Sequence, residues 1–466
     1  MKNIFYYSSL YTIFSMVTKL FSFIVILCLG SSFSSNKYAE FALLFSLHQG
    51  ITTFSIAGIN ESVAGFLKEI KTEKEKNYLF SNVFIAIIPS SIFVFLSSMF
   101  FYFFYLKDKN PELLFTYVLF TIISSILLGF STFKSQMNRL REDHFSSLFY
   151  LFIPQILMFL GGATFIYFYQ NIQAFFIGSS LSILFTVVLG RIIIKKSNFK
   201  VLNGSFSKNI IKNAFPYYLI AVLGWLGGYG NNFIINIFFD NFEIAAFTFI
   251  YTFSGIMLMV SNSLNQVWAP RFYNNFGKIS SGTLELQNNF FYGLLSIFMG
   301  IVVSIVILVY PIIIELIGGN LLLYKEMKLE LYLTLLSYVI YTPIWHYRIH
   351  YYANSEGKSL LRISTISSIL SLISMILFIV YLENIGIYYG FLSITLINLI
   401  LIYINSNKKW NLKINWIGML IGCLISFITY YLSINDYSNL FSVLFLTFSM
   451  ILIGIYISNH KITKIT

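Results

Sequence analysis

The residue with the clearest chemical character in the apolar part of this sequence is a lysine, Lys19, near the middle of the first long apolar stretch. A cation at the centre of a membrane-spanning helix costs roughly 2.5 to 3.5 kcal/mol on insertion scales, so such a residue usually faces a cavity or a partner. We therefore expect the Lys19 ammonium to attract an anionic substrate at the membrane midplane. The alternative is a lysine that pairs with another helix or extends to the interface.

A histidine and two amides are the next candidates. His48 lies roughly 15 Å along the second apolar stretch, at 1.5 Å per helical residue. Its imidazole is able to titrate during transport or to hydrogen-bond a sugar, and a neutral histidine bonded between helices is an equally good interpretation. Asn231 and Asn232 close a segment, 224–232, that holds four glycines. Because glycines permit bending and amides bind hydroxyl-rich ligands, this segment predicts a hinge that lines the pathway; tight helix packing is the alternative.

Two further groups lie where helices are expected to end on the inner side. Arg271 follows a Trp-Ala-Pro segment and is a candidate gate at the cytoplasmic mouth, although most such residues only anchor a helix end. His346 and His350 are four residues apart and would share a helix face. For this pair we favour an interfacial helix end, with Arg348 extending to a lipid phosphate, over a functional site.

Motifs for catalysis and cofactor binding are missing from the sequence. It holds neither a GxxxxGK[ST] phosphate loop nor a GxGxxG turn, and no paired carboxylates or metal-spaced histidines and cysteines gather in a predicted outer loop. No Asp or Glu lies near the centre of an apolar stretch, so no acidic proton relay is visible. The sequence therefore predicts a protein that is not an enzyme and that needs no cofactor.

The elements that position these residues are membrane-spanning helices. Of the 466 residues, 57% are hydrophobic and only 10% are charged, against roughly 25% charged residues in soluble domains. A helix needs about 20 mostly apolar residues to cross about 30 Å of hydrocarbon. The sequence predicts an all-α integral membrane protein with about fourteen transmembrane helices, at residues 4–29, 38–59, 78–106, 113–133, 145–168, 175–194, 214–237, 244–268, 290–317, 329–347, 363–382, 385–404, 416–432 and 440–457.

The positions of Lys and Arg test this count, because cytoplasmic loops hold most of these residues. With the N-terminus inside, 24 of the 30 cations fall in inside segments and five in outside loops, and the remaining one is Lys19. A missed helix would reverse every later loop, so the distribution supports fourteen helices with both termini cytoplasmic. The net charge of +12 therefore reflects membrane topology, and we expect no nucleic-acid partner.

The predicted helices divide into two six-helix bundles and two C-terminal helices. The longest loop, 191–213, is basic and separates residues 1–213 from residues 214–405, and residues 406–466 add the last two helices. A weak internal repeat supports this division, since residues 36–41 before the second helix are similar to residues 242–247 before the eighth. Transporters use repeated bundles of this kind to rock around a central site.

Four short motifs follow one another along the first twelve predicted helices. They are the loop end Tyr38-Ala39, the segment Ala57-Gly58-Ile59, the stretch from Asn231-Asn232-Phe233 to Trp268-Ala269-Pro270, and the turn Ile385-Gly386-Ile387-Tyr388-Tyr389-Gly390. In order and spacing they resemble the Wzx-type polysaccharide flippases of the multidrug/oligosaccharidyl-lipid/polysaccharide exporter superfamily. Asn231 and Asn232 replace the Asp-Arg pair of that family, and Ala39 replaces its glycine. Lipid II flippases are similar in carrying a cation in the first helix and two extra C-terminal helices.

The resemblance implies a flippase that turns an undecaprenyl-diphosphate-linked oligosaccharide repeat unit, of the O-antigen or capsule type, to the outer leaflet of a bacterial inner membrane by alternating access. Lys19 would meet the diphosphate, His48, Asn231 and Asn232 would meet the sugars, and Arg271 would stand at the cytoplasmic mouth. The implied partners are the lipid-linked substrate, membrane lipids, a polysaccharide polymerase and a chain-length regulator.

Two other transporters remain as alternatives. A lipid II flippase handles a chemically similar lipid diphosphate. A drug or metabolite antiporter of the same superfamily fits less well, because an exporter of organic cations is expected to place a carboxylate in its cavity, whereas this chain has a lysine in its first helix.

Overall fold

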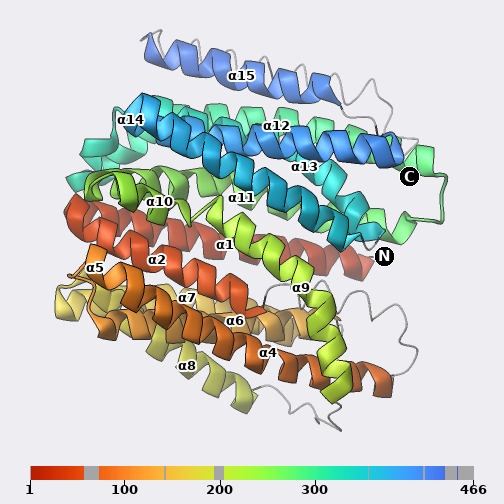
Figure 1. The fold of residues 1–466 in the computed structure, drawn as a ribbon, viewed down its shortest axis with the longest axis horizontal. Helices are drawn as coiled ribbons and strands as arrows, with labels where there is room; N and C mark the ends of the chain where they lie inside the picture. Colours follow the sequence, from red (N-terminus) through yellow and green to blue (C-terminus); the bar gives the residue numbers. More distant parts are fainter. Residues whose placement is uncertain are drawn as a thin grey trace. The chain divides into compact units, whose positions relative to one another are not determined.

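The computed structural model describes residues 2–56, 73–140, 143–193, 204–354, 356–412, 415–435 and 449, and these contain helices and no strand (Figure 1). The helices up to residue 238 are α1 (Lys2–Ser32), α2 (Ser35–Ile56), α4 (Glu73–Phe101), the π-helical turn η1 (Tyr102–Leu106), α5 (Lys107–Lys109), α6 (Phe115–Leu140), α7 (His144–Tyr169), η2 (Ile172–Ala174), α8 (Phe175–Ile193), α9 (Gly204–Leu226) and α10 (Asn231–Phe238). They are followed by α11 (Asn241–Asn275), α12 (Ser281–Ile317), η3 (Gly319–Tyr324), α13 (Lys328–Ala353), α14 (Gly357–Trp410) and α15 (Trp416–Ile434).

These helices show a multi-pass membrane protein, as the hydropathy predicted. Within the described residues, eight helices are long and apolar enough to cross a membrane, or nine if the bent pair of α9 and α10 counts as one span. Each of the first thirteen predicted spans overlaps a described helix, and the seventh overlaps both α9 and α10. The fourteenth, 440–457, lies outside the described residues except for residue 449. The count of fourteen therefore stays a prediction.

The eleventh and twelfth predicted spans form one element, α14, that is interrupted at Glu383. The backbone there has φ 54° and ψ −131°, a conformation that non-glycine residues rarely adopt. At 1.5 Å per residue, an uninterrupted helix of 54 residues would be about 81 Å long, far more than one bilayer crossing requires. The interruption falls between residues 382 and 385, where the sequence predicted the loop, so α14 consists of two helices.

Contacts divide the chain into two compact units, Met1–Thr248 and Phe249–Thr466. In the first unit α7 packs on α8, α6 packs on α2, α7 and α8, and α9 packs on α2 and α4. The interior between α2 and α8 is aromatic, with Phe41, Phe45, Phe175 and Phe176 all buried. The helices of the predicted seventh span are thus grouped with the first unit, and the division at residues 213 and 405 stays a prediction.

In the second unit α12 packs on α13 and α15, and α13 packs on α14. The backbones of α12 and α15 approach closely because glycines face one another. A Cβ added to Gly300 would lie 2.3 Å from the Gly422 oxygen, and one added to Gly418 would lie 2.5 Å from the Gly293 oxygen. Glycines at this spacing let helices pack closely in membranes. The predicted thirteenth span is therefore a packed part of this unit.

Candidate functional site

A break between α9 and α10 is the centre of the candidate site in the first unit. Residues 227–230 form a turn, and the two helices are bent by 43°. The backbone N–H groups of Gly228 and Gly230 both donate to the Trp225 oxygen, at 3.0 and 2.8 Å. A Cβ on Gly230 would lie 2.8 Å from the Leu226 Cα, whereas a Cβ on Gly224 would meet nothing within 4 Å. The segment in which a hinge was predicted thus contains a break, and Gly230 is the glycine that a close backbone approach requires.

The break is held against α2 by two hydrogen bonds to one serine. Trp225 Nε1 donates to the Ser46 backbone oxygen at 3.0 Å, and Asn232 Nδ2 donates to Ser46 Oγ at 2.7 Å. The Trp225 indole also covers Gly50, where an added Cβ would lie 2.7 Å from the ring, and it meets Phe54 edge to face at 5.3 Å. Because the indole occupies the space that Gly50 leaves open, the position of the break along α2 is fixed.

His48 lies on α2 inside an aromatic cluster that reaches the break. Its side chain is 1% exposed, stacks on Phe45 with ring centroids 6.2 Å apart, and lies 6.1 Å from the Phe176 ring. Phe45 in turn meets Tyr229, in the turn between α9 and α10, edge to face at 5.8 Å. Neither ring nitrogen of His48 has a hydrogen-bond partner among the described residues. Within the described residues, this histidine therefore makes no hydrogen bond to another helix.

The two asparagines of α10 are also incompletely bonded. Asn231 and Asn232 are both 1% exposed, and the side-chain oxygen of each lacks a partner in the part of the chain that the structure describes. Asn231 Nδ2 makes only a long contact, 3.4 Å, to the Gly227 oxygen. With the two ring nitrogens of His48, four buried polar atoms near the contact of α2 with the break lack partners among the described residues. Such atoms are rare in folded proteins and need an explanation.

An ionic network fixes the first turn of α2, the helix that carries Ser46 and His48. Lys37 Nζ lies 2.8 Å from Glu40 Oε1 and 3.0 Å from Glu112 Oε2. Gln173 Nε2 donates to Glu40 Oε2 and, at 3.1 Å, to the Glu112 backbone oxygen. The hydrogen bond to Glu40, assisted by Glu112, raises the pKa of the Lys37 amine against the opposing effect of burial. The network joins the start of α2 to η2 and to the segment before α6.

Lys19 lies on the exposed side of α1. Thr18 beside it is buried, whereas Val17, Lys19 and Leu20 are exposed. No hydrogen bond or ion pair joins the Lys19 ammonium to another described residue, so the pairing with a second helix that we considered is absent from that part of the chain.

Arg271 belongs to the second unit, where it is exposed on α11 one turn beyond Trp268. Trp268 Nε1 donates to Asn288 Oδ1 at 2.8 Å, which orients the amide so that Nδ2 faces His346 Nδ1 at 2.9 Å and His350 Nε2 at 3.4 Å. His346 and His350 are 0% and 7% exposed. They share a helix face, as their spacing predicted, and Asn288 binds both inside the unit. The interfacial helix end stays a prediction.

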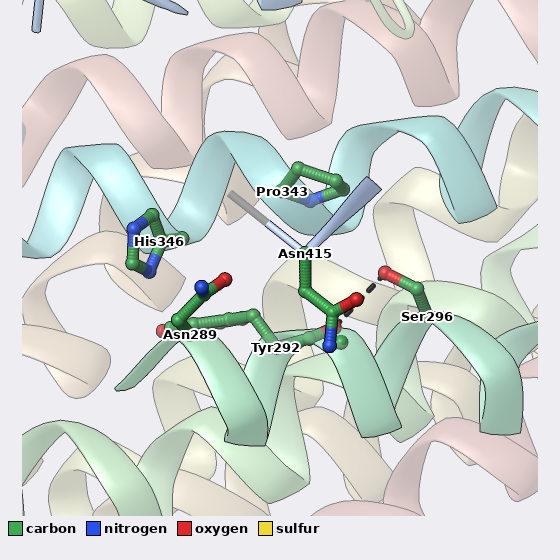
Figure 2. A pocket seen from close by; sticks show the side chains of 7 residues that line it. Asn289, Tyr292, Ser296, Pro343, His346 and Asn415 are labelled. Atoms are coloured by element: carbon green, nitrogen blue, oxygen red, sulfur yellow. Dashed lines mark hydrogen bonds between the residues drawn. The ribbon is translucent and has the colours of Figure 1, made fainter. Parts of the chain in front are cut away.

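A small pocket adjoins this cluster (Figure 2). Its lining consists of Asn289, Tyr292, Gly293 and Ser296 of α12, Pro343 and His346 of α13, and Asn415 just before α15. Asn415 Oδ1 accepts a hydrogen bond from the Gly418 N–H at 2.9 Å and so caps α15. The described residues contain no group of three or more His, Cys, Asp or Glu side chains suited to hold a metal ion. The pocket is lined by uncharged side chains and is too small to hold a water molecule.

Sequence reasoning missed Ser46, Trp225 and Asn288. Serines and asparagines within apolar helices carry no sign of the helix that they will face, so Ser46 and Asn288 left no usable signal. Trp225 did leave one, because a buried indole N–H usually needs a partner and this indole lies within the glycine-rich segment.

Comparisons with known proteins agree with this architecture. The sequence matches a family model described as polysaccharide biosynthesis protein over residues 1–276, more than half of the chain. Its structure is similar to that of the lipid II flippase MurJ in an inward closed conformation, with a TM-score of 0.72 and 16% identity over 97% of this chain and 99% of that chain. It is also similar to an inward-facing multidrug resistance MATE family transporter of the MOP superfamily, with a TM-score of 0.67 and 12% identity over 92% and 100% of the two chains.

A third similar structure is that of the MATE multidrug transporter DinF-BH, with a TM-score of 0.66 and 14% identity over 87% of this chain and 96% of that chain. No curated protein sequence matches this one. At these identities the solved structures show the fold alone, and the family model shows the family. The chain belongs to the family of polysaccharide biosynthesis proteins and has a fold shared by MurJ and MATE transporters.

Proposed function

We propose that this protein is a flippase that carries an undecaprenyl-diphosphate-linked oligosaccharide repeat unit, of the O-antigen or capsule type, from the cytoplasmic to the outer leaflet of a bacterial inner membrane. Both termini lie in the cytoplasm in this proposal. The observation that carries it is the break between α9 and α10 in a chain of the polysaccharide biosynthesis family. There, polar atoms of His48, Asn231 and Asn232 are buried without a hydrogen-bond partner among the described residues. A diphosphate and its sugars cannot cross hydrocarbon unaided, so a transporter must offer polar groups and a cation within the membrane.

Each candidate residue has a role in this transport. Lys19 neutralises the diphosphate. The ring nitrogens of His48 and the side-chain oxygens of Asn231 and Asn232 bond sugar hydroxyls when the break moves away from α2, because a hydroxyl both donates and accepts. Arg271 holds the substrate at the cytoplasmic mouth. The transfer proceeds by alternating access, and a polysaccharide polymerase and a chain-length regulator are the partners that receive the exported unit.

Lipid II is the second candidate substrate, because the lipid II flippase MurJ has a similar fold. Lipid II and a polysaccharide repeat unit both carry sugars on a lipid diphosphate, so the same cation and amides would serve either. The family match favours the polysaccharide unit. A drug antiporter is disfavoured, because the unpaired groups at the break of the first unit are an imidazole and neutral amides rather than carboxylates.

Complementation of a strain that lacks its polysaccharide flippase tests the proposal. The wild-type chain should restore surface polysaccharide and clear the accumulated lipid-linked repeat units, measured by mass spectrometry of extracted lipids. Lys19→Ala should abolish both effects while the protein still inserts, and Lys19→Arg should retain part of the activity because it keeps the charge. Lys358→Ala, which removes an exposed lysine at the start of α14, is the matched control and should retain activity.

Two outcomes would contradict parts of the proposal. Normal surface polysaccharide in a well-expressed Lys19→Ala strain would remove Lys19 from the pathway. Failure of the wild-type chain to clear repeat units, combined with rescue of a strain depleted of its lipid II flippase, would replace the polysaccharide unit by lipid II.

A further inference from the structure

One face of α13 carries an arginine and two aromatic residues that the proposed pathway does not yet use. Tyr341, Trp345 and Arg348 are spaced by four and three residues, so they lie one above another on the helix. All three are half-buried, and the Tyr341 and Trp345 rings meet edge to face at 6.0 Å. His346 and His350 lie on the buried side of the same helix, bonded to Asn288. The arginine face is therefore distinct from the histidine cluster.

The Arg348 guanidinium is only partly satisfied. Its Nη1 donates to the Tyr341 hydroxyl at 2.6 Å, and its central carbon lies 5.5 Å from the Tyr341 ring centroid. Its Nε is buried and has no hydrogen-bond partner among the described residues. The ion pairs recorded in the described part of the second unit join Lys325 to Glu315 and Lys409 to Glu356, and neither includes Arg348.

A second donor on the same face also lacks a partner. Trp345 Nε1 is buried, and no described residue accepts its hydrogen bond. The Arg348 guanidinium and the Trp345 indole N–H lie one turn apart, and both are hydrogen-bond donors. A ligand group with several acceptor oxygens would therefore satisfy both. Arginine binds phosphate oxygens through two parallel N–H groups, and aromatic rings beside it offer surfaces for sugar rings.

We propose that Tyr341, Trp345 and Arg348 form a binding site for the diphosphate of a lipid-linked saccharide, with Arg348 Nε and Trp345 Nε1 as donors to its oxygens. The site rests on the proposed function for the identity of the ligand, and it deepens that function by placing a second cation, besides Lys19, on the path of the diphosphate. It replaces our expectation that Arg348 only extends to a lipid phosphate at the interface. The substrate diphosphate and the phosphate of a bilayer lipid have the same chemistry, so the experiment must distinguish these two ligands.

Binding of geranylgeranyl diphosphate, a short polyprenyl diphosphate, to the purified full-length protein in detergent micelles provides the test. We expect Arg348→Gln to weaken binding by at least about tenfold, as expected for loss of a charge-assisted hydrogen-bond pair. Arg348→Lys should bind with an affinity between those of the wild type and Arg348→Gln, since it keeps the charge and loses the paired donors. Trp345→Phe, which keeps the ring and removes the N–H, should weaken binding by a few fold.

Arg362→Gln is the matched control, because Arg362 is an exposed arginine on the neighbouring α14 and its replacement changes the net charge equally. It should bind as the wild type does. Equal binding by Arg348→Gln and the wild type, or equal weakening by Arg348→Gln and Arg362→Gln, would overturn the site. Thermal unfolding of each variant in the same detergent checks that the fold is retained, and Trp345→Phe supplies the decisive comparison if Arg348→Gln unfolds.

Competition identifies the source of the phosphate. Excess phosphatidylglycerol in the micelles should leave the binding of geranylgeranyl diphosphate unchanged, and inorganic pyrophosphate should compete with it. Equal competition by phosphatidylglycerol would assign Arg348 to a bilayer lipid and overturn the substrate site. Absence of diphosphate binding by the wild type would overturn the proposed function as well, whereas wild-type binding that Arg348→Gln retains would overturn this inference alone.

Discussion

Both ring nitrogens of His48 lie in the interior of the first unit without a hydrogen bond from a described residue. An unsatisfied buried polar group costs roughly 1–3 kcal/mol. Phe45 and Phe176 pack on the ring, so an apolar side chain of similar size would fill the same space without that cost. His48 therefore lowers the stability of the conformation seen here. Its presence is explained if it binds sugar hydroxyls in a second conformation, as we propose.

The replacement His48→Leu separates these two effects. We expect a higher midpoint of thermal unfolding in detergent, because the unsatisfied nitrogens are removed, and loss of polysaccharide export in cells, because the sugar contact is removed. Thr53→Leu, which introduces a leucine at an exposed position of the same helix, is the matched control and should change neither measurement by much. Normal export by His48→Leu would remove His48 from the pathway, and a lower midpoint would show that the ring is stabilising where it lies.

At the residue scale, the sequence indicated which side chains have useful chemistry but not what each one meets. His48, Asn231 and Asn232 were selected for their types, and the structure brings all three to the contact between α2 and the break. Ser46, which holds that contact, lies 186 residues from Asn232 along the chain, and no local pattern encodes such a pairing. The partner of His346, Asn288, was unpredictable for the same reason, since it is 58 residues away.

At the element scale, the apolar spans were predictable because membrane hydropathy acts over about 20 residues at a time. The two similar segments both begin helices, since α2 starts at Ser35 and α11 at Asn241, and residues 38–41 and 244–247 are buried. The break between α9 and α10 was predictable from the cluster of glycines at 224–230. Its bend of 43° left no signal in the sequence, and its contact with α2 was not predictable because it involves Trp225 filling the space above Gly50, far away along the chain.

The two ends of the glycine cluster should respond differently to the same substitution. Gly230→Ala places a Cβ 2.8 Å from the Leu226 Cα and 3.0 Å from the Trp225 oxygen, so the turn must shift, and we expect a lower midpoint of thermal unfolding and reduced export. Gly224→Ala meets nothing within 4 Å and lies within α9, where alanine is favoured by up to about 1 kcal/mol. It should therefore unfold at the same or a higher temperature. Equal effects of the two substitutions would show that the break is not held by the close approach at Gly230.

At the scale of the whole molecule, orientation follows from charge rather than from packing. The basic loops predict which ends of the helices face the cytoplasm, because cytoplasmic loops hold most Lys and Arg residues. The interruption of α14 at Glu383 divides it into two membrane crossings. Whether α14 crosses once or twice decides on which side of the membrane every later residue lies. The sequence predicted a loop at this point from two apolar stretches separated by a few residues, and the positive φ of Glu383 now supports that division.

Labelling of three introduced cysteines tests this topology in intact spheroplasts. In a background with Cys28→Ser and Cys423→Ser, a membrane-impermeant maleimide should label Lys325→Cys and Asn384→Cys from outside, and it should label Lys408→Cys only after permeabilisation. The reason is that α13 and the two halves of α14 make three crossings between residues 325 and 408, an odd number. A single crossing by α14 would place residues 325 and 408 on the same side, although its 54 residues are far too long for one bilayer. Labelling of both from the same side would therefore refute the interruption as a loop between spans, and labelling in the reverse sense would invert the orientation of every helix from α13 onward.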